Sequence, residues 1–144
     1  MQTRPILIIE GDVDDMQVIV HALRHSTLPN EILVTRNGRQ AIDYLTHGGT
    51  MANGIPARPA LIFVDLKLPE RRGFEILADI RAHAATHYIP VVVLSSSDAL
   101  ADMQLAYDLG ANSYVRKPAS FAEFGEALRQ VASYWLIRNS TPRS

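Results

Sequence analysis

No cysteine occurs among the 144 residues, which excludes a disulfide framework and any thiolate site. A net charge of −1, from 14 basic and 15 acidic residues, leaves no basic field that would attract nucleic acid. Hydrophobic runs are short, and none approaches the ~20 apolar residues that span a membrane or resembles the core of a signal peptide. We therefore expect a cytoplasmic protein that binds neither nucleic acid nor membrane.

Short apolar runs recur along the chain and predict five strands. The runs are Ile6–Ile9, Ile32–Thr35, Leu61–Val64, Val91–Leu94 and Tyr114–Val115. Most of them lack the alternation of polar and apolar residues, which is typical of parallel strands covered on both faces. The intervening segments carry apolar residues at helical spacing, as at Met16, Ile19 and Leu23.

Strands that alternate with helices predict an α/β fold. We expect a flavodoxin-like (βα)5 doubly wound parallel sheet with strand order 2-1-3-4-5, formed by residues 1–138 and followed by a short polar tail, 139–144. Asp14 is the predicted N-cap of the first helix. Ser120 and Glu123 form a predicted capping box before the last helix.

Chemically active side chains follow several of the strands. In the expected strand order, the first and third strands are neighbours, so their carboxyl ends bring acidic residues to one rim of the sheet. The candidates at this rim are Glu10, Asp12, Asp65, Ser95 and Lys117. Crowded carboxylates suit a hard divalent cation such as Mg²⁺, and an ammonium and a hydroxyl suit the oxygens of a phosphoryl group. Asp65 could then be a nucleophile that accepts a phosphoryl group as an acyl phosphate.

In this combination the chain resembles the receiver domain of two-component response regulators. The resemblance runs from about Arg4 to Trp135 and rests on the acidic end of the first strand, Asp65 with Pro69 and Gly73, Ser95, and Lys117-Pro118 in order. The segment from Tyr107 to Tyr114 and the late Tyr134-Trp135 are most similar to the single-domain regulators associated with phytochrome-type histidine kinases.

The resemblance implies a role for each of these residues. Asp65 would be the phosphoacceptor, Glu10 and Asp12 acids of an Mg²⁺ site, Lys67 the donor of a backbone carbonyl to the metal, Ser95 the switching hydroxyl, Tyr114 the switching aromatic and Lys117 the phosphate-contacting lysine. It also implies a cis bond between Lys117 and Pro118. The phosphoryl donor would be a sensor histidine kinase or a phosphotransfer protein. The chain would catalyse at most its own phosphorylation and dephosphorylation and would not be a turnover enzyme.

Gly11 is the departure from the family pattern. It follows Glu10 at the position where receivers carry a second acid that binds the metal directly, and Asp12 comes one residue later. Loss of a carboxylate from the metal site predicts weak Mg²⁺ binding and slow phosphorylation. The alternative interpretation is therefore an atypical receiver that acts as a binding or dimer module without phosphorylation.

Two other classes of protein use a similar fold. A haloacid-dehalogenase-type phosphatase also has a strand-end aspartate, but its second aspartate, two residues later, is replaced here by Lys67. A nucleotide- or flavin-binding module would need a glycine-rich phosphate loop after a strand, and the sequence contains none.

The output of such a regulator has to leave through a protein surface, since we predict no effector domain after residue 138. The apolar stripe of the last helix continues beyond the expected end of the domain and would expose a hydrophobic patch. We therefore expect a homodimer in which Tyr134, Trp135, Leu136 and Ile137 take part.

Overall fold

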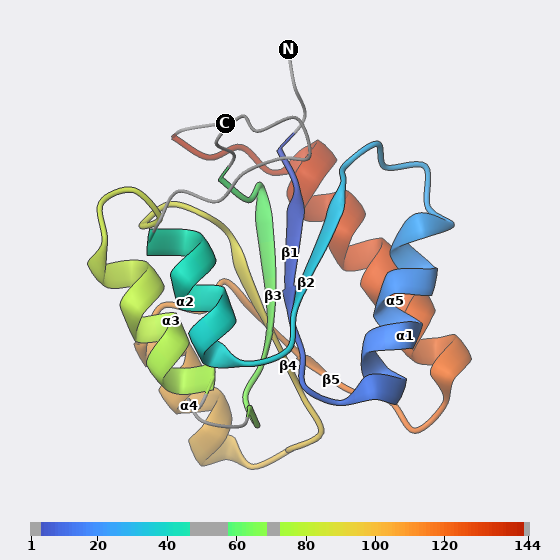
Figure 1. The fold of residues 1–144 in the computed structure, drawn as a ribbon. Helices are drawn as coiled ribbons and strands as arrows, with labels where there is room; N and C mark the ends of the chain where they lie inside the picture. The colour runs from blue at the N-terminus through green and yellow to red at the C-terminus, as the bar shows by residue number, and fades with distance from the viewer. Residues whose placement is uncertain (1–3, 47–57, 69–72, 143–144) are drawn as a thin grey trace.

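Five parallel strands form a single sheet in the order β2-β1-β3-β4-β5, as expected (Figure 1). The structure is a computed structural model that describes residues 4–46, 58–68 and 73–142. The strands are β1 (Ile6–Ile9), β2 (Ile32–Thr35), β3 (Leu61–Asp65), β4 (Val91–Ser95) and β5 (Ser113–Arg116). With the helices between them they form the predicted flavodoxin-like fold. Pro69 lies outside the described residues.

Helices cover both faces of the sheet (Figure 1). They are α1 (Val13–Arg24), α2 (Gly38–Thr46), α3 (Gly73–Ala82), α4 (Leu100–Asp108) and α5 (Phe121–Ser133), and α5 continues as a π-helical turn, η1 (Tyr134–Arg138). Helices α1 and α5 pack together on one face, and α2, α3 and α4 cover the other. None of the helices in the described ranges combines the length and apolar character that crossing a membrane requires.

Two hydrophobic cores result, one on each face, because successive residues of a strand point to opposite sides. Ile6 and Ile8 pack in the core beneath α1 and α5, where Phe63 is also fully buried. Leu7 and Ile9 pack in the core beneath α2, α3 and α4. This two-sided burial explains why the strand sequences are apolar without interruption.

Helix α1 begins two residues earlier than the sequence indicated. Its N-cap is Asp12, whose carboxylate accepts a hydrogen bond from the backbone N–H of Asp15, and Asp14 lies exposed in the first turn. The prediction of Asp14 as the cap was therefore wrong. Both residues suit a cap chemically, and apolar spacing alone does not locate a helix start to within one turn. The predicted cap of α5 is confirmed, since Ser120 accepts a hydrogen bond from the backbone N–H of Glu123.

Gly73 starts α3 directly against the end of β3. A Cβ atom at this position would lie 2.3 Å from the carbonyl oxygen of Asp65 and 2.7 Å from the Cα of Leu66. Only glycine permits this approach of helix to strand. The first residue of α3 therefore lies directly against the backbone of Asp65.

Arg81 lies near the other end of α3, where it forms hydrogen bonds with several other segments of the chain. Its guanidinium donates hydrogen bonds to the backbone carbonyls of Gly110, His87 and Ile89 and to the side chain of Asn112. Burial lowers the pKa of Arg81 from its ordinary value. The arginine thus ties the end of α3 to the segments that lead into β4 and β5.

The end of the chain places the four residues of the expected dimer surface in two environments. Trp135 and Leu136 pack against the core beneath α5, and the indole N–H of Trp135 donates to Ser113 Oγ at 3.2 Å. Tyr134 and Ile137 are 50% and 60% exposed. Two of the four side chains are therefore available to a partner.

Candidate functional site

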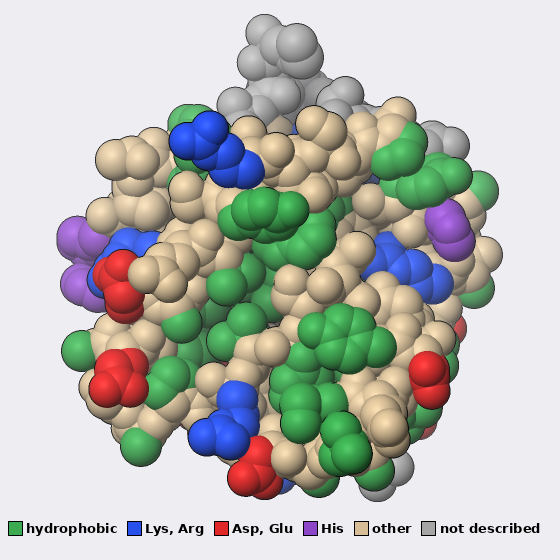
Figure 2. All heavy atoms as spheres, turned by 180° about the vertical axis from the view of Figure 1, so that it is seen from behind, with side chains coloured by type: hydrophobic (Ala, Val, Ile, Leu, Met, Phe, Trp, Pro, Cys, Tyr) green, Lys and Arg blue, Asp and Glu red, His purple; other side chains and the backbone are tan. Residues whose placement is uncertain are grey.

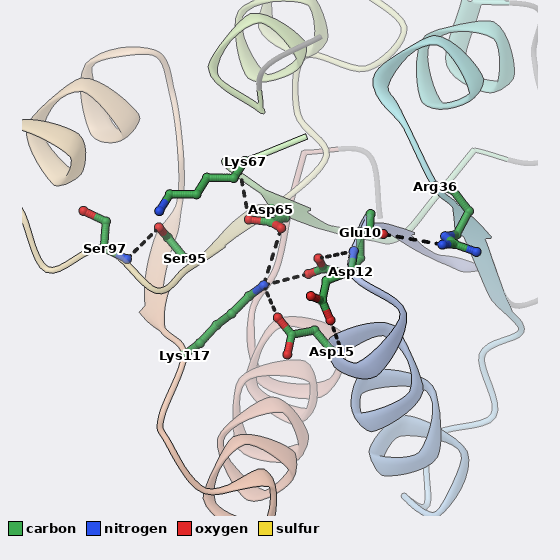
Figure 3. A network of polar contacts seen from close by, with 10 residues as sticks. Glu10, Asp12, Asp15, Arg36, Asp65, Lys67, Ser95, Ser97 and Lys117 are labelled. Atoms are coloured by element: carbon green, nitrogen blue, oxygen red, sulfur yellow. Dashed lines mark hydrogen bonds and ion pairs between the residues drawn. The ribbon is translucent and has the colours of Figure 1, made fainter. Parts of the chain in front are cut away.

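The carboxyl ends of four strands meet at one edge of the sheet and bring the candidate residues together (Figure 3). Glu10 follows β1, Asp65 ends β3, Ser95 ends β4 and Lys117 follows β5. The backbone N–H of Lys117 donates to the carbonyl of Ser95 at 2.7 Å, so pairing of the two last strands continues up to the lysine. The convergence expected from the strand order is thus present.

Lys117 is the centre of this cluster. Its ammonium donates to Asp15 Oδ2 at 2.6 Å, to Glu10 Oε2 at 3.0 Å and to Asp65 Oδ2 at 3.4 Å. The side chain of Glu10 is fully buried, and those of Asp65 and Lys117 are 9% and 11% exposed. A buried cation thus neutralises a group of carboxylates that would otherwise repel one another.

The surroundings shift the protonation of two of these groups. Burial, together with the hydrogen bond and the charge of Asp65, raises the pKa of Glu10 to about 8, although Lys117 opposes the shift. Burial disfavours the charge on Lys117, but the hydrogen bond to Asp15 and the charges of Asp65 and Glu10 outweigh it and raise the pKa of the ammonium. The cluster therefore favours the charged form of Lys117, and burial favours the neutral form of Glu10.

Asp65 is held at both oxygens. Oδ2 accepts from Lys117, and Oδ1 accepts from the backbone N–H of Lys67 at 3.1 Å. The Lys67 side chain is exposed and extends past Asp65 on the side of Ser95 (Figure 3). These contacts fix the orientation of the carboxylate at the end of its strand.

Asp12 lies at the rim of the cluster. Its backbone N–H donates to Glu10 Oε1 at 3.2 Å, while its exposed side chain caps α1. Gly11, between the two acids, offers only its backbone, and its carbonyl accepts from Arg36 at 3.5 Å. The strand end therefore contributes one buried carboxylate, that of Glu10.

Ser95 and Tyr114 belong to a second group of contacts beside Asp65. Ser95 is buried, and its hydroxyl oxygen accepts from the backbone N–H of Ser97 at 3.0 Å. Tyr114, partly buried, donates its hydroxyl to the carbonyl of Ser97 at 3.0 Å. Both residues thus hold the same short segment between β4 and α4. The bond between Lys117 and Pro118 is trans, so the implied cis bond was wrong.

The carboxylates at the site fit a magnesium ion only with help from other ligands. Among the described residues, no group of three acidic, histidine or cysteine side chains is arranged to hold a metal. Glu10 and Asp65 do lie together, and Mg²⁺ in proteins is commonly bound by one or two carboxylates plus waters. These two carboxylates would hold a Mg²⁺ ion together with water molecules, and the Lys67 carbonyl remains the additional ligand that the family resemblance implies.

Asp15 is the site residue that the sequence analysis missed. It makes the shortest contact with Lys117, although it belongs to the first turn of α1 and not to a strand end. One signal could have found it: Asp15 precedes Ile19 by four residues and Ala22 by seven, so it shares the buried face of the helix.

Comparison with known proteins gives a consistent result. The response regulator receiver domain family matches residues 6–129. The response regulator Rcp1 of Synechocystis sp. is 33% identical over 137 residues, which cover 95% of this chain and 92% of Rcp1. The structure of the phosphorylated cyanobacterial phytochrome response regulator RcpA superimposes with a TM-score of 0.88 at 35% identity and covers 98% of this chain and 99% of RcpA. The Mn²⁺-bound form of Rcp1 gives a TM-score of 0.86 at 31% identity, with 97% and 99% covered.

Proposed function

The chain belongs to the response regulator receiver domain family, and we propose that Asp65 accepts a phosphoryl group from a sensor histidine kinase or a phosphotransfer protein. One observation carries the proposal: a nearly buried Asp65 ends a central strand with the Lys117 ammonium 3.4 Å from its carboxylate. Receiver domains generally interact with such donors and are not turnover enzymes. The match to RcpA, a phosphorylated phytochrome response regulator, over nearly its whole length supports a regulator of the same kind, and we propose a phytochrome-type histidine kinase as its phosphoryl donor.

The chemistry follows from the groups around Asp65. A carboxylate oxygen of Asp65 attacks the phosphorus of a phosphohistidine, the P–N bond breaks, and its electron pair returns to the imidazole. Lys117 and the hydroxyl of Ser95 then face the new phosphoryl oxygens and stabilise their charge. Mg²⁺, when bound, neutralises charge that develops on the transferred group. Tyr114 and Ser95, which both contact Ser97, would report the new group to α4.

A groove beside the site is suited to a protein donor. It has a volume of about 490 Å³ and runs between α1 and α5, where Val18, Phe121 and Arg129 are among its lining residues. Both helices begin at the edge of the sheet where Asp65 lies, so the groove opens next to the phosphoacceptor. Phe121 is 59% exposed and offers an apolar contact for a helix of the donor.

The phosphoacceptor proposal is tested by intact mass. After incubation with a cognate kinase or a small phosphodonor and Mg²⁺, the protein should gain one phosphoryl group. Asp65→Asn should abolish the gain, because an amide is not nucleophilic enough to form the acyl phosphate. A phosphoryl group that persists on the Asn variant would refute the assignment. Asp43→Asn, an exposed substitution on α2, is the matched control and should retain the gain in mass.

The alternative function, a receiver that acts without phosphorylation, is motivated by Gly11 alone, and membership of the receiver family does not favour it. The same mass measurement separates the two functions, because an atypical receiver would remain unmodified at any Mg²⁺ concentration. The homodimer belongs to either function. Its candidate contacts are the exposed Tyr134 and Ile137, with the partly buried Trp135 and Leu136 behind them.

A further inference from the structure

Asp15 brings a carboxylate to Lys117 from a helix. Its Oδ2 lies 2.6 Å from the ammonium, closer than either strand-end acid. Figure 3 shows the ammonium between Asp65 on one side and Asp15 on the other. The side chain of Asp15 is 24% exposed, more than that of Glu10 or Asp65, so it lies toward the outer side of the cluster.

The first turn of α1 fixes this position. The Asp12 cap accepts from the backbone N–H of Asp15 at 2.9 Å, and Ile19, one turn later on the same face, is fully buried. Asp15 is thus anchored at its backbone and directed toward the sheet by the register of the helix. Its carboxylate therefore belongs to the built geometry of the site.

The Lys117 ammonium would compete with a Mg²⁺ ion for the same carboxylates. Its ammonium contacts both Glu10 and Asp65, which are the two carboxylates that fit Mg²⁺. A Mg²⁺ ion bound to these two carboxylates would repel the ammonium and replace it as their partner. The ammonium, at 11% exposure, would then lack a counter-ion unless a third acid keeps it.

We propose that Asp15 is the residue that positions Lys117: it retains the ammonium beside the site when Glu10 and Asp65 are engaged by Mg²⁺. The site has Gly11 in place of an acid after β1, and it thereby keeps the carboxylates of Glu10 and Asp65 for the cation and that of Asp15 for the lysine. The inference rests on one part of the proposed function, the binding of Mg²⁺ to Glu10 and Asp65.

The test is a titration of the complete protein with Mg²⁺, followed by backbone NMR shifts and without any phosphodonor. Asp15→Asn keeps the size of the side chain but removes its charge, and we expect Mg²⁺ affinity to fall about tenfold, as for other groups that support metal ligands. Asp14→Asn is the matched control: it removes the same charge from the same helical turn, on an exposed residue, and should change affinity less than about twofold.

A double-mutant cycle shows whether the effect passes through Lys117. In a Lys117→Gln background, Asp15→Asn should cost no more than Asp14→Asn does. Asp15→Glu, which restores the charge, should recover part of the affinity. The inference is overturned if Asp15→Asn binds Mg²⁺ as Asp14→Asn does, if its loss is undiminished without Lys117, or if the wild-type protein binds no Mg²⁺. Circular dichroism verifies that each variant is folded. The phosphoacceptor proposal is decided independently, by the mass of the Asp65→Asn variant.

Discussion

Gly11 sets the number of carboxylates at the end of β1. Among the described residues, Gly110 is the glycine with positive φ, so the backbone at Gly11 accepts an L side chain without that strain. We expect Gly11→Asp to tighten Mg²⁺ binding by at least about tenfold, because it returns an acid to the metal site. Mg²⁺ titration of the variant and the wild type by NMR shifts measures the change. Equal dissociation constants would mean that Asp12 already supplies the missing ligand.

Glu10 should make stability depend on pH in a direction unusual for an acid. Its pKa is raised from 4.5 to about 8 in the folded protein, chiefly by burial, so unfolding releases a proton between these values. Without metal, the contribution of Glu10 to the free energy of unfolding should therefore be largest below pH 4.5. It should fall as the pH rises to about 8. Glu10→Gln, which cannot titrate, should flatten this decline. Urea unfolding in a chelator across that range measures it, and parallel curves for the two proteins would contradict the expectation.

At the scale of elements, Arg81 connects α3 to two other segments. Arg81→Met keeps the length of the stem but leaves three backbone carbonyls without their charged donor. A hydrogen bond to a charged group contributes about 1.5–3 kcal/mol, so we expect the loss of these bonds to lower the free energy of unfolding by at least about 2–4 kcal/mol. Arg129→Met removes an exposed ion pair with Glu126 and should cost below about 0.5 kcal/mol. A similar cost for both variants in urea unfolding would show that the Arg81 contacts contribute little.

The sequence predicted the strands and helices well, because uninterrupted apolar runs and helical spacing are direct consequences of burial between two layers. It placed Glu10, Asp65, Ser95 and Lys117 at one edge because strands that alternate with helices are parallel and end at the same edge of the sheet. Asp15 escaped because it lies on a helix, whereas candidate site residues were sought only at the ends of strands. Its spacing of four residues from the buried Ile19 was the signal that could have revealed it.

At the scale of the whole molecule, hydrophobic side chains gather on the face opposite to the view of Figure 1 (Figure 2). The large exposed apolar residues of the chain include Leu100, Leu105 and Tyr107 of α4 and Tyr134 and Ile137 of η1. A patch of this kind marks a protein contact more often than a solvated surface. Of the four residues that the sequence predicted for the dimer surface, Tyr134 and Ile137 are the two that belong to this exposed apolar set.

Ile137→Ser should weaken the proposed homodimer by about fivefold or more, because a central apolar contact contributes over about 1 kcal/mol to association. Val13→Ser is the control, since Val13 is also exposed, at 46%, but lies at the start of α1. Sedimentation equilibrium measures both variants. A wild-type protein that is monomeric at high micromolar concentration would rule out the dimer, and equal association of the two variants would rule out this surface.

The sheet separates two hydrophobic cores, because successive side chains of each strand point to opposite faces. Neighbouring residues such as Ile8 and Ile9 contact different sets of helices, so a change of packing on one side is shielded from the other by the strands. Strand β5 is a place where the two halves are joined by polar contacts: Ser113 accepts from Trp135 on the α5 side, and Tyr114 donates to Ser97 on the α4 side. A shift of this edge strand would therefore be felt in both halves at once, through two adjacent residues.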